Sequence, residues 1–472
     1  MYEKIRTLHF VGIGGIGMSG IAEVLLNLGY RISGSDLSDN ASVQRLRAMG
    51  ATLYLGHAEE NVRDVDVVVH SSAVTFNNPE LQAARRRRIP IARRAEMLAE
   101  LMRIKYGIAI AGTHGKTTTT SMVATLLGKA GMDPTVVNGG IVKAFNSNAR
   151  LGHGDFMVTE ADESDGSFLK LFPIIAVVTN MDPEHLENYG SFDAVRQAFM
   201  SFVEKIPFYG LAVLCLDHPE VAAMVPRLTD KRVITYGLQE GADLQAVNIR
   251  RDGERTRFQV NRRDPNLGTY SPLGEVGLSL PGRHNVSNAL AAVAVAMELE
   301  IPWSTIDQAL DQYKGVRRRF DILRNDPERA IIDDYAHHPI EIAATLQGAR
   351  EKFGRQRRLV AIFQPHRYSR VHALLAEFLR CFQDADLVLV DHIHPAGEEP
   401  LPDFSPAAMR AHLLAGIQAE SGVPTGPLPD GDLLSQGHAE LEAMLQQGDV
   451  VVFLGAGSIT KKARHFAGPE CA

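Results

Sequence analysis

The stretch Ile108-Ala-Ile-Ala-Gly-Thr-His-Gly-Lys-Thr-Thr-Thr-Thr120 decides the fold of this chain. Its apolar start predicts a short buried strand, and the strand ends in a turn with two glycines, a lysine and several hydroxyls. Gly112 and Gly115 allow a tight turn whose N–H groups point inward, and Lys116 adds a positive charge. The Thr117 hydroxyl can bind Mg²⁺. These features together predict a phosphate-binding loop.

This loop matches a shortened form of the P-loop pattern. The longer pattern has a glycine five residues before Gly115, where this chain has Ile110, so the match is to G-x-x-G-K-T. A helix is predicted from Thr118 to Lys129, and its positive N-terminal end adds to the anion site. An ordinary strand-turn-helix corner without a ligand is the alternative. Gly-Lys-Thr-Thr directly after an apolar strand favours a nucleotide site.

Composition indicates an ordinary soluble protein of several domains. The 472 residues are 45% hydrophobic and 22% charged, which is enough chain for about three packed cores. The formal net charge of −7 argues against a general binder of nucleic acid or membrane surfaces. The basic run Arg85 to Arg88 is interpreted as a solvated helix end. Three scattered cysteines, Cys215, Cys381 and Cys471, follow no metal spacing and favour the cytoplasm.

A second glycine-rich motif lies near the N-terminus. A strand predicted from Thr7 to Ile13 leads into Gly12-Ile-Gly-Gly-Ile-Gly17 and then a helix from Met18 to Leu28. A second strand ends at Asp36, where an acidic side chain can meet a ribose hydroxyl or a base. His70-Ser-Ser-Ala73, after a later strand, is a second candidate wall of the same site. The motif predicts a ligand with a diphosphate without specifying NAD.

Acidic side chains follow two predicted strands of the central region. The strand Phe156 to Thr159 leads into Glu160, which we interpret as a ligand of Mg²⁺, directly or through water. The acids that follow it are expected to be solvated loop charges: Asp162, Glu163 and Asp165. The strand Ile174 to Val178 leads toward His185, for which a site role and an ordinary loop hydrogen bond are both open.

The last third predicts another doubly wound sheet. Polar clusters follow its strands, at Asp333-Asp-Tyr-Ala-His-His-Pro339 and Gln364-Pro-His-Arg-Tyr-Ser-Arg370. A polar turn, Pro281 to Asn288, is expected to cap an alanine-rich helix or to read a purine. The predicted fold is α/β with three domains. They are an N-terminal Rossmann-like sheet (1–105), a central P-loop domain (106–320) and a C-terminal Rossmann-like domain (321–472).

Six motifs, in order, resemble those of the Mur ligases of peptidoglycan assembly. They are Gly12 to Met18, Gly112 to Thr118, Thr159 to Ser164, Asn285 to Asn288, Asp333 to Pro339 and His366 to Arg370. The resemblance spans almost the whole chain and is greatest for the branch that adds L-alanine. It implies a cytoplasmic amide ligase, monomer or homodimer, that uses ATP with Mg²⁺ or Mn²⁺. ATP would phosphorylate the lactyl carboxylate of UDP-N-acetylmuramate, and the amine of L-alanine would attack the acyl phosphate.

The resemblance also implies roles for individual residues. Catalytic roles fall on Lys116, Glu160, His185 and Arg319. ATP binding is expected of Gly112, Thr113, His114, Gly115, Lys116, Thr117, Thr118, Asn288, Arg319 and Asp334. Binding of the sugar nucleotide is expected of Gly12, Gly14, Gly15, Gly17, Asp36, His70, Ser71 and Ser72. The amino-acid pocket falls on His338, His366, Arg367 and Arg370, and metal binding on Thr117, Glu160 and His185.

One position departs from several members of the family, and two rival functions remain. Several relatives have a lysine, carbamylated to bridge a metal, about fifteen residues after the equivalent of His185. Here that region contains Ala198-Phe-Met-Ser201 and Lys205 is displaced, so no carbamylated lysine is expected. The rivals are a ligase that recycles a tripeptide onto the same nucleotide sugar and an NAD(P)-dependent oxidoreductase.

Overall fold

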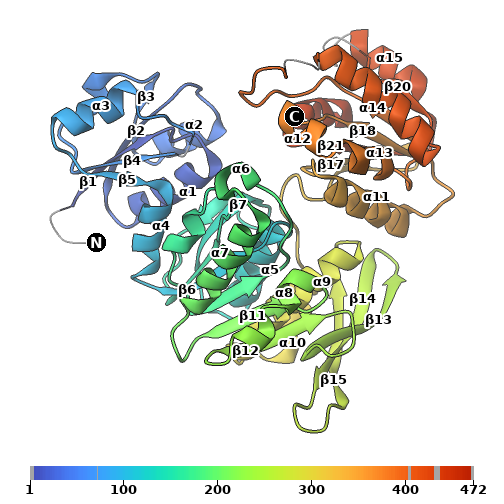
Figure 1. Cartoon of the computed structure of the whole chain (residues 1–472), viewed down its shortest axis with the longest axis horizontal. Helices are drawn as coiled ribbons and strands as arrows, with labels where there is room; N and C mark the ends of the chain where they lie inside the picture. Colours follow the sequence, from blue (N-terminus) through green and yellow to red (C-terminus); the bar gives the residue numbers. More distant parts are fainter. Residues whose placement is uncertain (1–4, 72, 402–404, 430–435, 469–472) are drawn as a thin grey trace. The chain divides into compact units, whose positions relative to one another are not determined.

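The computed structural model describes residues 5–71, 73–401, 405–429 and 436–468, and Figure 1 shows the chain. Two residues singled out from the sequence, Ser72 and Cys471, lie outside these ranges. The chain divides into two compact units. Unit 1 comprises residues 1–249, 257–277 and 286–314, and unit 2 comprises residues 250–256, 278–285 and 315–472. No helix in the described ranges is both long enough and apolar enough to cross a membrane.

The first sheet of unit 1 is parallel and has the order β3-β2-β1-β4-β5. Its strands are β1 Thr7–Val11, β2 Arg31–Asp36, β3 Thr52–Leu55, β4 Val67–His70 and β5 Ile91–Arg93. Its helices are α1 Ile16–Asn27, α2 Ala41–Ala48, α3 Pro79–Arg86 and α4 Arg94–Met102. Side chains of Asn40 and Asn78 accept N–H groups of the first turns of α2 and α3, as N-caps do. As expected, Arg85 to Arg88 form an exposed helix end.

The second sheet of unit 1 has ten strands, and the strand before the phosphate-binding loop is central in it. The order is β15-β14-β13-β12-β11-β10-β6-β9-β7-β8. The strands on the loop side are β6 Tyr106–Ala111, β7 Thr135–Val142, β8 Ser147–Arg150, β9 Phe156–Glu160 and β10 Ile175–Val178. The others are β11 Leu211–Cys215, β12 Arg232–Gly237, β13 Leu244–Asp252, β14 Arg255–Arg263 and β15 Tyr270–Leu278. Helix α1 packs on β7 and β8, which joins the two sheets within unit 1.

The helices of the second sheet include one whose start differs from the prediction. They are α5 Lys116–Lys129, α6 Leu186–Tyr189, α7 Phe192–Glu204, α8 Pro219–Ala222, α9 Arg283–Glu298 and α10 Trp303–Asp311. The polar segment before α9 was expected to be a cap, but α9 begins at Arg283. Asn285 and Asn288 therefore lie within the first two turns of the helix itself.

The sheet of unit 2 has the order β16-β17-β21-β18-β19-β20. Its strands are β16 Asp321–Asn325, β17 Arg329–Asp334, β18 Leu359–Phe363, β19 Leu387–Val390, β20 Thr425–Pro427 and β21 Asp449–Leu454. Within the described residues of this sheet, only the edge strand β16 is antiparallel to its neighbour. The helices are α11 Pro339–Phe353, α12 Tyr368–Ala373, α13 Leu375–Arg380, α14 Pro406–Ser421, α15 Gln436–Met444 and α16 Ile459–Ala467. The carboxyl ends of β17, β18 and β19 thus share one edge, where such sheets bind ligands.

Candidate functional site

The phosphate-binding loop connects β6 to α5 at the centre of its sheet. Gly112 and Gly115 have φ angles of +133° and +84°, which side chains with a Cβ rarely adopt. A Cβ on Gly112 would overlap the hydroxyl of Thr179, and one on Gly115 would lie 2.6 Å from Asn288 Oδ1. Glycine is therefore required at both positions, and Asn288 lies beside the loop as the ATP-site prediction needs.

The segment after β10 holds the loop in place. Asn180 Oδ1 accepts the N–H of His114 at 2.7 Å, and Asn180 Nδ2 donates to His114 O at 3.0 Å. The Thr179 hydroxyl donates to the same carbonyl at 2.6 Å, and the N–H of Asp182 donates to Thr113 Oγ1 at 2.8 Å. Asn180 was not singled out from the sequence. The available signal was its position directly after a strand that neighbours β6.

Lys116 is partly buried, and its ammonium contacts one carboxylate, that of Glu163. Its Nζ donates to Glu163 Oε1 at 2.9 Å and to the loop carbonyl of Gly112 at 2.6 Å. Burial alone would lower the pKa of the Lys116 ammonium. The negative charges of Glu163, Asp162 and Glu160 outweigh that effect, so the pKa lies above its ordinary value. The loop therefore carries a permanent positive charge.

Two of the three acids expected to be solvated have structural partners. Glu163 is 4% exposed and forms the ion pair with Lys116, and Asp162 Oδ2 lies 3.0 Å from Nη2 of Arg94. Only Asp165 is exposed, as predicted. The prediction was wrong for Glu163, because the Lys116 ammonium offsets the cost of burying its charge and the sequence does not reveal that cation. The Asp162 side chain keeps 40% of its surface exposed, so this charge is partly solvated.

Glu160 and Thr117 lie at the same sheet edge as the loop. Glu160 is the register partner of Ile110, two residues before Gly112, and its Oε1 accepts the N–H of Gly139 at 2.7 Å. Thr117 is in the first turn of α5 and is 7% exposed. The two oxygen-bearing side chains proposed to bind a divalent cation therefore come from elements that meet at one edge. Their donor chemistry suits Mg²⁺.

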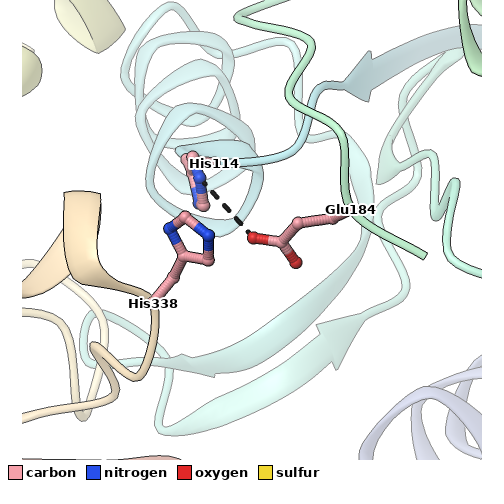
Figure 2. A group of neighbouring side chains, drawn as sticks. All are labelled: His114, Glu184 and His338. Carbon is pink, nitrogen blue, oxygen red and sulfur yellow. Dashed lines mark ion pairs between the residues drawn. The ribbon is translucent and has the colours of Figure 1, made fainter. Parts of the chain in front are cut away.

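An imidazole and two acids gather beside the loop. His114 Nε2 lies 3.7 Å from Glu184 Oε1, the pair joined by the dashed line in Figure 2, and 3.6 Å from Asp182 Oδ2. His185 Nε2 lies 3.7 Å from the other oxygen of Glu184. His185 is the N-cap residue of α6 and has a φ angle of +57°. His185 therefore belongs to an acidic cluster within unit 1. The third side chain in Figure 2, His338, belongs to unit 2 and is described with that unit.

A cavity of about 660 Å³ opens over the N-terminal glycine motif. Five residues predicted to bind the sugar nucleotide line it: Gly12, Gly14, Gly15, Asp36 and Ser71. Five polar side chains that were not predicted also line it: Asn40, His57, Thr75, Asn77 and Asn78. Gly17 and His70 are not among the lining residues; a Cβ on Gly17 would meet Arg94, and His70 is buried with Nδ1 2.9 Å from Ser71 O. The role of these two residues stays a prediction.

Asp36 holds the glycine motif directly. Its Oδ2 accepts the N–H of Gly14 at 2.8 Å, and Asn40 Nδ2 donates to Gly14 O at 3.3 Å. A Cβ on Gly14 would lie 2.6 Å from Asn40 Nδ2 and 2.9 Å from Asp36 Oδ2. The close approach of these side chains therefore explains the glycine.

In unit 2, Asp334 ends β17, and Arg319 Nη1 lies 4.0 Å from Glu341 Oε1, so the predicted pairing of Arg319 with Asp334 on the phosphate side stays a prediction. Asp334 accepts the N–H groups of Phe320 at 2.6 Å and Ala336 at 2.7 Å. Burial raises the pKa of the Asp334 carboxyl to about 6, although the charge of Arg319 opposes the shift. The Arg319 guanidinium lies 5.0 Å from the centre of the Tyr335 ring.

Three histidines meet at the edge where β17, β18 and β19 end. The His366 ring stacks on His394 with centroids 5.4 Å apart and contacts His337 at 5.8 Å. Burial, with the charges of His337, Arg370, His394 and Arg367, lowers the pKa of His366 to about 3, so this ring is neutral at pH 7. The sequence-based prediction did not include His337 or His394.

His338, the predicted neighbour of these rings, begins α11. Its Nδ1 accepts the N–H of Ile340 at 3.4 Å in a capping box with Glu341. The side chain is 7% exposed. Its place in the amino-acid pocket stays a prediction.

The structure gives Lys205 a location that makes carbamylation testable. Lys205 is the C-cap of α7, and its Nζ lies 5.2 Å from the centre of the Phe172 ring. Burial lowers the pKa of this amine. We expect intact-mass and peptide analysis of active protein, in bicarbonate buffer, to find Lys205 unmodified. A carbamate on Lys205 that rises and falls with activity would contradict this expectation.

Comparison with protein families finds matches along almost the whole chain. Residues 7–106 match the model "Mur ligase family, catalytic domain". Residues 110–296 match "Mur ligase middle domain", and residues 318–457 match "Mur ligase, glutamate ligase domain". The predicted division at residues 105 and 320 stays a prediction.

Two relatives that match almost the whole chain share one name. A protein of Magnetococcus marinus named UDP-N-acetylmuramate–L-alanine ligase is 60% identical over 469 residues, covering 99% of this chain and 98% of the relative. One of a Bradyrhizobium species with the same name is 53% identical, covering 98% and 97%. The crystal structure of UDP-N-acetylmuramate–alanine ligase from Thermotoga maritima has a TM-score of 0.81 at 31% identity, covering 98% of both chains. A murein peptide ligase from Psychrobacter arcticus, 24% identical with 98% of both chains covered, has a TM-score of 0.70 and shares the fold.

Proposed function

Because the chain belongs to the Mur ligase family, we propose that it joins L-alanine to the lactyl carboxylate of UDP-N-acetylmuramate at the expense of ATP. The reaction belongs to peptidoglycan precursor synthesis. The observation that carries the proposal is that unit 1 holds both a phosphate-binding loop with an ion-paired lysine and a separate cavity over a second glycine motif. All the reactants are water-soluble, so we place the reaction in the cytoplasm.

The chemistry proceeds in two steps. A lactyl carboxylate oxygen attacks the γ-phosphorus of ATP and ADP leaves, which gives an acyl phosphate. The neutral amine of alanine then attacks the acyl carbon, phosphate leaves with the shared oxygen, and the amine gives its extra proton to solvent. Activation is needed because a free carboxylate is a poor electrophile.

The first step brings together anions that repel, so the site must neutralise charge. Lys116 offers a permanent positive charge, and the first turn of α5 offers the N–H groups of a helix N-terminus to the phosphates. Asn180 and Thr179 keep that loop in one conformation before ATP arrives. Such preorganisation avoids the cost of ordering the loop during reaction.

A divalent cation is implied by the family, and the residues present suit one. Thr117 and Glu160 would hold it with oxygen ligands. His185, beside Glu184, would be a ligand of a second cation, as the family resemblance implies. When bound, the cation supplies charge neutralisation for the phosphate oxygens. Glu160 keeps its orientation through the N–H of Gly139.

The edge of unit 2 would receive the amino acid. Arg367 and Arg370 offer guanidinium groups that suit an α-carboxylate. The neutral His366 ring would sit beside them without adding a further charge. Arg319 and Asp334 would act on the phosphate side, as the family resemblance implies.

A phosphate-release assay with each amino acid in turn tests the proposal. We expect phosphate only when ATP, UDP-N-acetylmuramate and L-alanine are all present, with a product of the summed mass less water. Faster turnover with the tripeptide L-alanyl-γ-D-glutamyl-meso-diaminopimelate would instead indicate the recycling ligase. Oxidation of NADH, seen at 340 nm, without phosphate release would indicate the oxidoreductase.

A further inference from the structure

A carboxylate is completely buried beneath the sugar-nucleotide cavity, and the proposed chemistry does not use it. Glu80 lies in the first turn of α3 and is 0% exposed. Its neighbour Pro79 lines the cavity. A buried acid without partners would be strongly destabilising, so its contacts show what it holds.

Neutral donors surround Glu80 on both oxygens. Asn61 Nδ2 donates to Oε1 at 2.7 Å, and the Ser35 hydroxyl donates to Oε2 at 2.5 Å. His9 Nε2 lies 3.4 Å from Oε1. Burial alone would raise the pKa of the Glu80 carboxyl, but the nearby His9 ring and the hydrogen bonds from Ser35 and Asn61 outweigh it and lower the pKa. Glu80 is therefore a carboxylate and can only accept.

These contacts determine which nitrogen of His57 carries a proton. His57 Nδ1 lies 3.1 Å from Glu80 Oε2 and 2.9 Å from Ser35 Oγ. The single hydroxyl proton of Ser35 is used on Glu80, so both groups near Nδ1 are acceptors. Nδ1 must therefore carry the proton.

The same ring lines the cavity. The His57 side chain is 16% exposed, while Nδ1 faces a completely buried carboxylate. Nε2 is the only other polar atom of the ring, and in the neutral imidazole it is an acceptor. An acceptor suits the N3–H of uracil or a ribose hydroxyl and does not suit phosphate oxygens, which have no proton to donate.

The network also reaches the glycine motif through the backbone. Ser35 O accepts the N–H groups of Gly12 at 2.9 Å and Ile13 at 3.0 Å. Glu80 thus holds both a ring that lines the cavity and the strand end that fixes the first glycine of the motif.

We propose that Glu80 is a positioning residue for the sugar nucleotide, which fixes the His57 ring with Nδ1–H inward so that an acceptor nitrogen faces the cavity. The inference rests on the proposed function, since it takes this cavity to be the site of the UDP group. Glu80 does not touch the substrate. It acts through His57 and Ser35.

Glu80→Gln is the direct test, because it keeps the shape but puts an NH₂ group where only acceptors fit. We expect KM for UDP-N-acetylmuramate to rise about tenfold, with kcat and KM for ATP changed by less than about twofold. Glu23→Gln is the matched control. Glu23 is another largely buried carboxylate on a helix of unit 1, α1, with Arg45 and Ser147 as its partners, and it does not line the cavity. Its KM values should stay within about twofold of wild type.

A double-mutant cycle with His57→Ala tests the route of the effect. His57→Ala should raise the same KM, and Glu80→Gln should add less than about twofold to it, because residues that act through one contact are not additive. An additive effect, an unchanged KM in folded Glu80→Gln, or an equal rise in Glu23→Gln would overturn the proposal. If Glu80→Gln does not fold, His57→Ala decides, and an unchanged KM overturns it. Failure of the proposed function would look different, since wild type itself would then make no product.

Discussion

Replacing Lys116 with alanine is expected to lower the rate of phosphate release by about 10³-fold at saturating substrates. The substitution removes the positive charge that Lys116 brings to the phosphate-binding loop. It also leaves Glu163 buried without its cation, so the free energy of unfolding should fall as well. Rate and thermal unfolding should therefore be measured on the same preparation.

Lys129→Ala is the matched control for this substitution. Lys129 ends the same helix and is exposed, with its Nζ 3.3 Å from Gln312. Its rate should stay within about twofold of wild type, as for surface substitutions generally. A folded Lys116→Ala protein that turned over at the normal rate would show that this loop does not bind the reacting phosphates.

Gly112→Ala should reduce the rate by at least about 10²-fold, because a small displacement of a phosphate-binding loop costs that much. The new Cβ would overlap the Thr179 hydroxyl and lie 3.1 Å from the backbone nitrogens of Thr179 and Asn180. The φ of +133° adds strain for any residue with a Cβ. Either the loop or the segment after β10 must move, and the hydrogen bonds to His114 connect the two.

Gly128→Ala, in helix α5, is the matched control and is expected to stabilise the protein without loss of activity. A Cβ there meets nothing within 4 Å, and the position is exposed. Alanine should raise the free energy of unfolding by about 0.5–1 kcal/mol, since glycine is a poor helix former, and leave the rate unchanged. Phosphate release and thermal unfolding should be measured on both variants. If Gly112→Ala and Gly128→Ala lose equal activity, the geometry at Gly112 does not cause the loss.

The sequence predicts well those parts of this protein that local chemistry determines. The strand before Gly112 and the turn that follows it were predicted because an apolar run and a glycine turn have a physical signature of their own. The position of Glu160 at the same sheet edge as the loop could also be predicted, because neighbouring parallel strands have their carboxyl ends at one edge.

Partners that come from distant segments could not be predicted in this way. Glu163 is buried because Lys116 lies 2.9 Å away, and nothing in its local sequence differs from a solvated acid. The contact of His337 with His366 arises because β17 and β18 both neighbour β21. The role of Glu80 depends on Ser35, 45 residues before it. Such contacts appear only once the topology is known.

The central claim is that ATP activates the sugar acid before the amine attacks, and an isotope measurement tests it most directly. UDP-N-acetylmuramate carrying ¹⁸O in its lactyl carboxylate would be turned over with ATP and L-alanine, and the released phosphate would be analysed by mass spectrometry. An acyl phosphate requires one labelled oxygen to leave with each phosphate. Unlabelled phosphate formed together with the amide product would contradict the account.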